Sequence, residues 1–523
     1  MPKFLHSVVV QALFVFVCSA LLATLFLSWD GFVDPDAFYH AKISQIIWEN
    51  GPIQDFRWLD LTELATHPAD LHLTFHLFVA PFTAVFGMFD GLRVASVLLA
   101  AACLTTFFLI LRWLKLPSPI LWTAFLATSP PLLLRLLLGK ASPLAILLFL
   151  FGIAAAYLRK PWLVALATFA FALSHGGWIY LAGSVVLLAF GDVLFTWIVD
   201  GKPIREAIQK TLWKESLAGF AGAFIGLLIH PNFPQNILLS YTQVVRIGLG
   251  TPFQHVMLGN EWRPTDPGVL LSNYAPWIIL MLLGFMGMVF AGRLPLDKFR
   301  ARLLVSLGWI FAVLLALTFK SRRNTEYLAP IVALWVAVLW SLVDIPRFRT
   351  QLADMFVGRW KRFSRVVIPV IVFSLVVVTG NGLWGTWESL HEEKYTDEVY
   401  ADSMQAISER ANAGDRVFHT SWDEFPMLFA QDDDLKYIVG LDPTFLYVAS
   451  STLSDAVRDT TWGVTSTTKE AIWSVVHDQT GSRFVFISLP RHQPFYEIIR
   501  LDERYIPLFF SSSSAAFEVR STD

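Results

Sequence analysis

HLTFHLFVAPFTAVFGMF, residues 72–89, is the stretch that decides the topology of this chain. It is apolar, but it contains two histidines and a proline, so it either spans a bilayer or forms a re-entrant segment. The basic loops separate these possibilities. If 72–89 does not span and the N-terminus is cytoplasmic, almost every basic loop faces the cytoplasm, as the positive-inside rule requires. If 72–89 spans, those loops move outside.

The composition is that of a polytopic membrane protein. Of the 523 residues, 55% are hydrophobic and only 16% are charged, and the mean hydropathy is +0.54. A formal net charge of -2 indicates no nucleic-acid partner. The two cysteines, Cys18 and Cys103, lie inside apolar segments and predict no disulfide scaffold.

The apolar segments predict about eleven membrane spans. The first, 8–29, follows a short basic start (Lys3) and ends without a cleavage site of small residues, which predicts an uncleaved signal-anchor helix. The others are 92–113, 119–134, 143–158, 161–175, 178–199, 217–230, 276–292, 303–319, 327–343 and 366–384. The basic loops assigned to the cytoplasm are 112–115, 159–160, 202–214, 293–302 and 347–365. The predicted transmembrane domain is therefore 1–384, with external loops at 30–91 and 231–275.

The remaining residues, 385–523, change character and predict a small external α/β domain. Short strand-like runs occur at RVFHT (416–420), KYIVG (436–440), RFVFISL (483–489) and AAFEV (515–519). Helical stretches such as 397–414 lie between them.

Polar residues gather on the predicted external side, where they are costly unless they serve a site. In chain order they are Asp34, Asp36, His40, His67, His72, His76, Arg135, Lys140, His175, and the stretches HPNFPQN (230–236), GNEWRP (259–264), KSRRNTEY (320–327) and SWDEFP (421–426). A polar cavity at the external membrane surface is the interpretation that this pattern favours.

The aspartates after the first span allow two interpretations, which can coexist. Asp34 and Pro35 can begin a helix that ends at Gly51, with Asp34 as its N-cap. In that helix Asp36 and His40 share one face. Two carboxylates at a cavity mouth also suit divalent-cation binding or base chemistry.

Three further motifs also carry a structural alternative. His72 and His76 have a spacing that permits metal ligation, although hydrogen-bonded helix histidines share it. Arg322 and Arg323 suit phosphate because guanidinium offers a planar fork. The alternative is one more charged loop, which is less favoured because this loop breaks the inside-positive pattern. Glu261 lies in a loop too polar to pack in lipid, where a turn closed by a salt bridge is the alternative.

The order of these motifs resembles the GT-C superfamily of membrane glycosyltransferases, and most closely the catalytic subunit of oligosaccharyltransferase. The motifs are the aspartates after the first span, Arg135 and Gly139 in LLRLLLGKASPLAI, SHGGWIY (174–180), GNEWRP, RRNTEYLAP (322–330) and a Trp-Asp pair in the C-terminal domain. The resemblance covers nearly the whole chain.

The resemblance implies a role for each motif. Asp34 or Asp36 matches the acidic motif that contacts metal and acceptor, and Glu261 matches the residue that completes this catalytic site, with Mg²⁺ or Mn²⁺ as the possible metal. Arg322 or Arg323 matches the arginine that grips the donor phosphate, with Arg135 as a further phosphate ligand. Trp422 and Asp423 resemble the start of the Trp-Trp-Asp-Tyr-Gly acceptor motif, and His40 and His175 are placed on the acceptor side.

The sequence departs from the family pattern in two places. The second acidic motif should follow Gly139, but Lys140, Ala141, Ser142 and Pro143 stand there and none is a carboxylate. In the acceptor motif Ser421 precedes Trp422, and Glu424-Phe425 replace Tyr-Gly. These changes bear on the metal site and on recognition of a glycosylation sequon.

The expected activity is transfer of a sugar or glycan from a polyprenyl-phosphate-linked donor to an acceptor on the external face. The acceptor is a protein or, as in enzymes resembling the aminoarabinose transferases, a lipid or polysaccharide. A transporter or non-catalytic scaffold is the remaining alternative, but a transporter should show repeated halves. The expected location is a prokaryotic plasma membrane, among membrane lipid, with the N-terminus cytoplasmic and the C-terminal domain outside.

Overall fold

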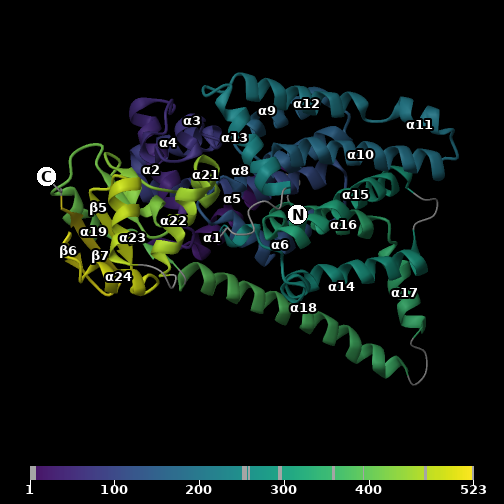
Figure 1. The fold of residues 1–523 in the computed structure, drawn as a ribbon. Coiled ribbons are helices and arrows are strands. Elements are labelled where there is room, and N and C mark those ends of the chain that lie inside the picture. The colour runs from purple at the N-terminus through teal and green to yellow at the C-terminus, as the bar shows by residue number, and fades with distance from the viewer. Residues whose placement is uncertain are drawn as a thin grey trace. The chain divides into compact units, whose positions relative to one another are not determined.

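A computed structural model describes residues 7–249, 256, 259–292, 297–355, 360–392, 394–463 and 468–520 (Figure 1). Their contacts divide the chain into two compact units. Unit 1 comprises Met1–Leu27, Ser96–Gly226 and Asn260–Glu393, and unit 2 comprises Ser28–Ala95, Leu227–Gly259 and Lys394–Asp523. Unit 2 thus combines most of the C-terminal region with all of the first predicted external loop and part of the second. The domain boundary at 384/385 stays a prediction.

The described chain is mostly helical, as expected for a polytopic membrane protein. Five of the described helices are long and apolar enough to cross a bilayer: α1 (Val8–Phe26), α5 (Met88–Trp113), α10 (Trp178–Ile198), α14 (Pro267–Ala291) and α15 (Lys298–Lys320). The other predicted spans correspond to α8 (Ser142–Tyr157), α9 (Pro161–Ala172), α12 (Trp213–Leu228), α16 (Thr325–Ser341), α18 (Trp360–His391) and the broken segment described below. The count of eleven spans stays a prediction.

The stretch that decides the topology forms the helix α4 (Leu73–Phe86), which has 14 residues and contains Pro81. A helix needs about 20 residues to cross a bilayer. Its length therefore agrees with the interpretation that 72–89 does not span, which stays a prediction.

The segment 119–134 is not one continuous helix. It divides into α6 (Pro119–Ala127) and α7 (Pro130–Leu136), with Thr128 and Ser129 between them. Pro130 and Pro131 occupy the first turn of α7, where they lack the N–H groups that would continue the helix from α6. The predicted span over 119–134 therefore consists of two helices rather than one, and the second, short helix carries Arg135 at its end.

Helix α16 forms the centre of unit 1. It is buried along nearly all of its length and packs against α14, α15, α7, α8 and α6. Elsewhere in unit 1, α12 packs closely on α9 through Gly222, where a Cβ atom would lie 2.1 Å from the carbonyl oxygen of Ala165. Small residues allow such close approach of helices in a membrane protein.

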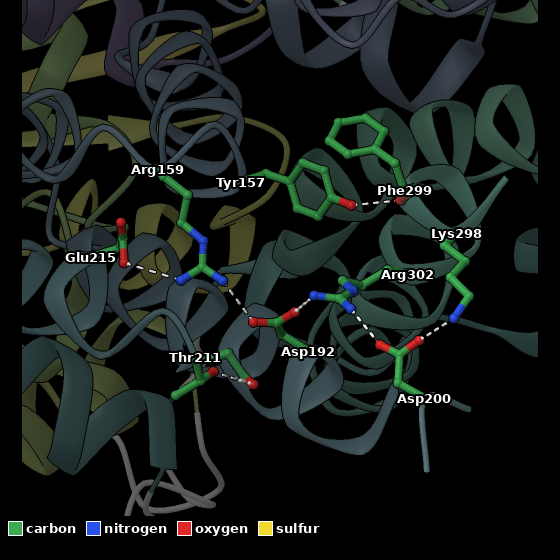
Figure 2. Close-up of polar contacts among 10 residues, drawn as sticks. Tyr157, Arg159, Asp192, Asp200, Thr211, Glu215, Lys298, Phe299 and Arg302 are labelled. Carbon is green, nitrogen blue, oxygen red and sulfur yellow. Dashed lines mark hydrogen bonds and ion pairs between the residues drawn. The ribbon is translucent and has the colours of Figure 1, made fainter. Parts of the chain in front are cut away.

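An ion-pair network joins α10, α12, α15 and the residues after α8 within unit 1 (Figure 2). Asp192 accepts hydrogen bonds from Arg159 at 2.8 Å and from Arg302 at 3.1 Å. Asp200 accepts from Arg302 and Lys298, both at 2.7 Å. Glu215 lies 3.7 Å from Arg159. Basic residues of two loops assigned to the cytoplasm, 159–160 and 293–302, are thus paired with carboxylates of unit 1.

Unit 2 contains a five-stranded sheet in the order β4-β3-β5-β7-β6. The strands are β3 (Arg416–His419), β4 (Lys436–Tyr437), β5 (Phe484–Ser488), β6 (Tyr505–Phe510) and β7 (Ser514–Val519), of which β4, β3 and β5 are parallel. The four predicted strands are confirmed. The edge strand β6 was missed, because Pro507 interrupts its pattern.

Both faces of this sheet are covered. Phe484 and Phe486 belong to one buried cluster, and Val485 and Ile487 belong to another. Successive side chains of a strand point to opposite faces, so β5 reads as an unbroken apolar run. The first cluster also includes residues of α2 (Asp36–Asn50), α19 (Ala401–Ser408) and α20 (Phe425–Gln431). The helix predicted over 397–414 is shorter than expected, because α19 covers only Ala401–Ser408.

A second, two-stranded sheet fixes the segment just after the first span. In it β1 (Gly31–Phe32) pairs antiparallel with β2 (Tyr395–Thr396). A Cβ atom on Gly31 would lie 2.2 Å from the carbonyl oxygen of Tyr395, so only glycine fits there. The helix α2 follows directly and ends at Gly51, whose φ of 80° suits glycine. It ends at Gly51 as predicted, and it begins at Asp36, one residue after the predicted start at Pro35.

The remaining helices connect these parts. They are α3 (Glu63–Thr66), α11 (Ile204–Lys210), α13 (Gln235–Tyr241), α17 (Ile345–Met355), α21 (Pro443–Ala449), α22 (Ser451–Thr461), α23 (Lys469–Trp473) and α24 (Gln493–Ile499). Arg293 and Arg359, which contribute to two basic loops of the topology prediction, lie outside the described residues.

We expect single cysteines at three exposed positions, introduced after replacement of Cys18 and Cys103, to report the topology. Asn50, Gln209 and Ala413 are all exposed. A membrane-impermeant maleimide should label Asn50→Cys and Ala413→Cys in intact cells and label Gln209→Cys only after lysis. Labelling of Gln209→Cys from outside would reverse the assignment of the basic loops and contradict the predicted topology.

Candidate functional site

Two arginines of unit 1 converge on one carboxylate. The Arg135 side chain, at the end of α7, donates from Nη1 to Oε2 of Glu261 at 3.2 Å. Arg323 Nη1 lies 3.7 Å from the other carboxylate oxygen, Oε1. We call Arg135, Arg323, Glu261 and His175 the arginine cluster. It unites four motifs that lie far apart in the sequence.

The two loops that carry Glu261 and Arg323 are tied together by their backbones. The Ser321 hydroxyl donates to the carbonyl of Glu261 at 2.8 Å, and the N–H of Arg322 donates to the carbonyl of Arg263 at 2.9 Å. The Arg323 guanidinium also lies 5.1 Å from the ring centre of Trp262. GNEWRP and KSRRNTEY were separate polar stretches in the sequence, and here they form one structure.

His175 adds a second kind of donor to the arginine cluster. The N–H of Gly177 donates to His175 Nδ1 at 2.9 Å, so the ring proton must be on Nε2. Nε2 lies 3.2 Å from Arg323 Nη2, which is also a donor. With Arg135 nearby on Glu261, this part of the arginine cluster is rich in hydrogen-bond donors, which suits an anion.

The charges of the arginine cluster are strongly coupled. Burial alone would raise the pKa of Glu261, but Arg323, Lys140 and Arg135 outweigh it and the pKa falls well below its usual range. Burial would conversely lower the pKa of Arg323, but Glu261, Glu326 and two nearby tyrosines together outweigh that effect and raise it. Glu261 is therefore an ionised carboxylate held by three cations at neutral pH.

The structure distinguishes the two adjacent arginines. Arg323 joins the arginine cluster, whereas the Arg322 side chain is exposed. The next carboxylate in the chain, Glu326, is only 1% exposed, and its Oε1 has no hydrogen-bond partner among the described residues. The sequence interpretation did not single out Glu326, because its position in the first turn of α16 also suits an ordinary helix start.

In unit 2, Asp34 has the capping role that the sequence predicts. Its Oδ1 accepts a hydrogen bond from the N–H of Asp36 at 3.1 Å. Asp36 lies in the first turn of α2, and both aspartates are partly exposed. The direct role of Asp34 and Asp36 in chemistry stays a prediction beside this capping role.

The histidines of the same region are linked through buried hydrogen bonds rather than through an exposed face. His76 Nδ1 contacts Oδ2 of Asp70 at 2.8 Å, and His76 Nε2 contacts His40 Nδ1 at 2.7 Å. The ring of His72 lies edge-on to that of His40, with centroids 5.1 Å apart. Asp70 was not singled out in the sequence. The spacing of His72 and His76 could not reveal it, since the contact depends on how the preceding loop turns.

Trp422 and Asp423 follow strand β3 of unit 2. Asp423 Oδ2 accepts from Arg491 at 2.8 Å, while Oδ1 is buried without a hydrogen-bond partner among the described residues. Burial raises the pKa of the Tyr395 phenol, and the carboxylates of Asp423 and Asp34 raise it further. Tyr395 therefore lies within electrostatic reach of both aspartates, which brings the first acidic motif and the Trp-Asp motif into one region of unit 2.

Glu424 stands where the acceptor motif has tyrosine, and its role is internal. It accepts from the Thr420 hydroxyl at 2.7 Å and from the N–H of Ser421 at 3.0 Å. The Ser488 hydroxyl, at the end of β5, also donates to it. Glu424 thus joins the ends of β3 and β5 and is committed to the sheet.

The residues of unit 1 do not favour a metal at Glu261. No group of three or more histidine, cysteine, aspartate or glutamate side chains that could hold a metal ion occurs among the described residues. Glu261 itself is engaged by Arg135 and Arg323. Cationic side chains around a carboxylate repel a metal cation, but they can bind another anion in place of the carboxylate. We therefore derive no step through a metal, and Mg²⁺ or Mn²⁺ at Asp34 and Asp36 stays a prediction.

Comparison with known proteins identifies the fold. No protein-family model and no curated protein matches the sequence. Among solved structures, the chain is similar to the oligosaccharyltransferase AglB from Archaeoglobus fulgidus in complex with an inhibitory peptide and a dolichol-phosphate. The TM-score is 0.61 at 12% identity, and the match covers 98% of this chain and 74% of that one.

Two further structures give the same result. For ArnT from Cupriavidus metallidurans bound to undecaprenyl phosphate, the TM-score is 0.54 at 13% identity, with 98% of both chains covered. For the arabinofuranosyltransferase AftD from Mycobacteria, it is 0.59 at 13% identity, with 98% of this chain and 40% of that one covered. The resemblance to the GT-C superfamily is thereby confirmed at the level of fold: the chain is an integral membrane protein with the GT-C architecture.

Proposed function

We propose that this protein is a membrane glycosyltransferase that takes a sugar or glycan from a polyprenyl-phosphate-linked donor and transfers it to an acceptor on the external face. The arginine cluster carries this proposal. Arg135 and Arg323 hold one carboxylate between them, and His175 directs a further N–H toward Arg323. A phosphate oxygen satisfies all of these donors when it replaces the carboxylate of Glu261.

The fold supports the same chemistry. The AglB structure contains dolichol-phosphate and the ArnT structure contains undecaprenyl phosphate. When a sugar leaves a polyprenyl phosphate, negative charge develops on the departing phosphate oxygen. Preorganised cations at that position lower the barrier because they are already oriented. Arg323 and Arg135 have this role in the proposal, and Asp34 and Asp36 bind and orient the acceptor.

A lipid or polysaccharide acceptor is the second candidate. Its support is the C-terminal motif, in which Glu424 is committed to Thr420 and Ser421 and so cannot contribute to acceptor binding as the replaced residue would. Asp423 retains one buried oxygen without a partner among the described residues, which can accept from an acceptor hydroxyl as well as from a peptide. The identity of the sugar does not bear on this distinction.

We expect Arg323→Gln to weaken binding of a polyprenyl phosphate about tenfold or more. A charge-assisted hydrogen bond to phosphate is worth roughly 1.5–3 kcal/mol, and each 1.4 kcal/mol is a factor of ten. Binding is measured on the purified protein in detergent micelles by a fluorescence titration.

The matched control is Arg322→Gln, which removes the same charge one residue earlier from an exposed side chain. It should change the affinity by about twofold at most, since exposed charges at a distance are screened. Equal effects of the two variants would mean that the loss of one positive charge, rather than the loss of a contact made by Arg323, weakens binding. An unchanged affinity in Arg323→Gln would show that the arginine cluster does not bind the donor.

A further inference from the structure

A buried arginine at the start of helix α5 binds a carboxylate of the C-terminal region. Arg93 is only 1% exposed, although it lies at the beginning of a predicted membrane span. Its Nη1 donates to Oδ2 of Asp397 at 2.9 Å, and its Nη2 donates to Oδ1 at 2.5 Å. A buried charge at such a position is costly, so an ionisable residue there indicates a specific task.

The carboxylate that Arg93 binds comes directly after strand β2. Asp397 follows Thr396, the last residue of β2, and its N–H donates to the carbonyl of Asp30 at 3.4 Å, just before β1. Two parallel hydrogen bonds from a planar guanidinium fix the orientation of a carboxylate as well as its distance. Arg93 therefore holds the end of β2, and with it the pairing of β2 with β1.

Arg93 also contacts the other strand of this pair. Its guanidinium carbon lies 4.5 Å from the ring centre of Phe32, the last residue of β1. Phe32 packs edge-on against Phe38 and Phe89, with centroids 5.4 and 6.0 Å away, and the last two rings are 5.2 Å apart. Residues 33–37, which include both aspartates of the acidic motif, therefore begin and end at rings that the first two turns of α5 hold in place.

The contacts of Arg93 thus link two groups in the region of unit 2 that holds the acidic motif and the Trp-Asp motif. Asp34 lies two residues after Phe32, and Tyr395 lies two residues before Asp397. The phenol of Tyr395 is within electrostatic reach of Asp34. Apolar side chains could fill the space around Phe32 without burying a charge, but they would not fix the orientation of the segment that carries Tyr395.

We propose that Arg93 is a positioning residue for the acidic motif: through Asp397 and Phe32 it fixes Asp34 relative to Tyr395, so that the acceptor is held in one orientation. This inference rests on the proposed transferase function, because it concerns the acceptor site of that enzyme. Arg93 is too deeply buried to touch the acceptor itself. It belongs to unit 2, whereas the arginine cluster proposed for the donor belongs to unit 1.

The first test does not depend on activity. Hydrogen–deuterium exchange with mass spectrometry, on the purified full-length protein in lipid nanodiscs, measures local opening of backbone amides. In Asp397→Asn, peptides that cover 30–38 and 394–400 should exchange about tenfold or more faster than in the wild type, because an amide oxygen replaces a carboxylate that accepts both bonds of the arginine fork. Unchanged exchange of 30–38 would overturn the proposal.

The matched control is Asp90→Asn, which removes the other carboxylate of Arg93. Asp90 Oδ1 accepts from Nη1 at 2.9 Å, but it lies one turn earlier on the same helix, and its side chain is 58% exposed. Asp90→Asn should change the exchange of 30–38 by about twofold at most, as loss of an exposed pair generally does. Equal increases in both variants would mean that loss of any negative charge beside Arg93 loosens the motif, and would overturn the role of the link to β2.

The second test measures glycosyl transfer by Arg93→Gln. We expect kcat/KM for the acceptor to fall about tenfold to a hundredfold, because a small misplacement of groups that orient a substrate costs this much. The KM for the donor should change about twofold at most, since the donor site is separate. Arg93→Lys keeps the charge but loses the planar fork, so it should recover only part of the loss. If Arg93→Gln does not fold, Asp397→Asn takes its place.

A second arginine–carboxylate pair of unit 2 controls for loss of stability. Arg416 donates to both carboxylate oxygens of Asp60, at 2.9 and 2.8 Å, so Arg416→Gln removes a pair of the same geometry and leaves Arg93 in place. It should lower kcat/KM for the acceptor by about twofold at most. Wild-type kcat/KM in folded Arg93→Gln, or an equal loss in Arg416→Gln, would overturn the positioning role.

The two tests separate this inference from the proposed function. If the wild-type protein transfers no sugar from any polyprenyl-linked donor tested, the proposed function fails. The exchange of 30–38 in Asp397→Asn and Asp90→Asn then still decides whether Arg93 holds the acidic motif through its link to β2.

Discussion

Asp34→Asn/Asp36→Asn is expected to lower glycosyl transfer about 10²-fold or more while the protein remains folded. Each carboxylate can form a charge-assisted hydrogen bond to the acceptor, worth roughly 1.5–3 kcal/mol, and asparagine loses the charge. The fold should tolerate the change because asparagine caps helices as well as aspartate does, and Asp34 uses a single oxygen to accept from the N–H of Asp36. Initial rates with a fixed amount of lipid-linked donor measure the effect.

The matched control for this double variant is Asp55→Asn, an exposed aspartate of the same predicted external loop. It should leave the rate unchanged. The single variants add information: if Asp34 acts only as a cap, Asp34→Asn will be silent in both stability and rate. Full activity of the double variant would reduce the acidic motif to a helix start and contradict its assignment to the acceptor site.

Asp192→Asn is expected to destabilise the protein by about 3 kcal/mol. Asp192 is 5% exposed and accepts from both Arg159 and Arg302. Loss of one partner from a buried ion pair costs roughly 3–5 kcal/mol because the other charge remains without compensation. The lower end applies because the side chains of Arg159 and Arg302 are 43% and 31% exposed. The free energy of unfolding in bicelles measures the loss.

An exposed ion pair of the same unit provides the comparison. Glu206 pairs with Lys202 at 2.9 Å, and their side chains are 37% and 42% exposed. Glu206→Gln should cost no more than about 0.5 kcal/mol, as exposed helix pairs generally do. If Asp192→Asn lowered the free energy of unfolding no more than Glu206→Gln does, the ion pairs of Figure 2 would be solvated surface pairs that do not stabilise the packing of these helices.

The features that the sequence predicts correctly are those fixed by neighbouring residues. The cap at Asp34, the glycine end at Gly51 and four of the five strands all depend on local chemistry, and all three are confirmed. The break between α6 and α7 was equally local, since Pro130 and Pro131 mark it. It was missed because the apolar composition of 119–134 continues across the prolines, and composition alone does not register a missing N–H.

Contacts between distant segments could not be predicted in the same way. Arg322 and Arg323 are equivalent in the sequence, and only the turn Arg322–Asn324 decides that Arg323 joins Glu261. Asp70 gains its role from a loop that brings it to His76. Such pairings require the fold, whereas the prediction of an anion site rested only on the unusual position of the arginines in the sequence.

The pairing of β1 with β2 has a consequence for the order in which the protein is made. Phe32 emerges from the ribosome early, but its partner Tyr395 emerges only after all of the apolar helices of unit 1. Until then β1 has no partner strand and Gly31 has no close contact with Tyr395, so the turn that carries Asp34 is not yet held in place. A nascent chain can thus insert its helices well before its acidic motif is set, and a segment made after those helices completes the geometry of one made among the first.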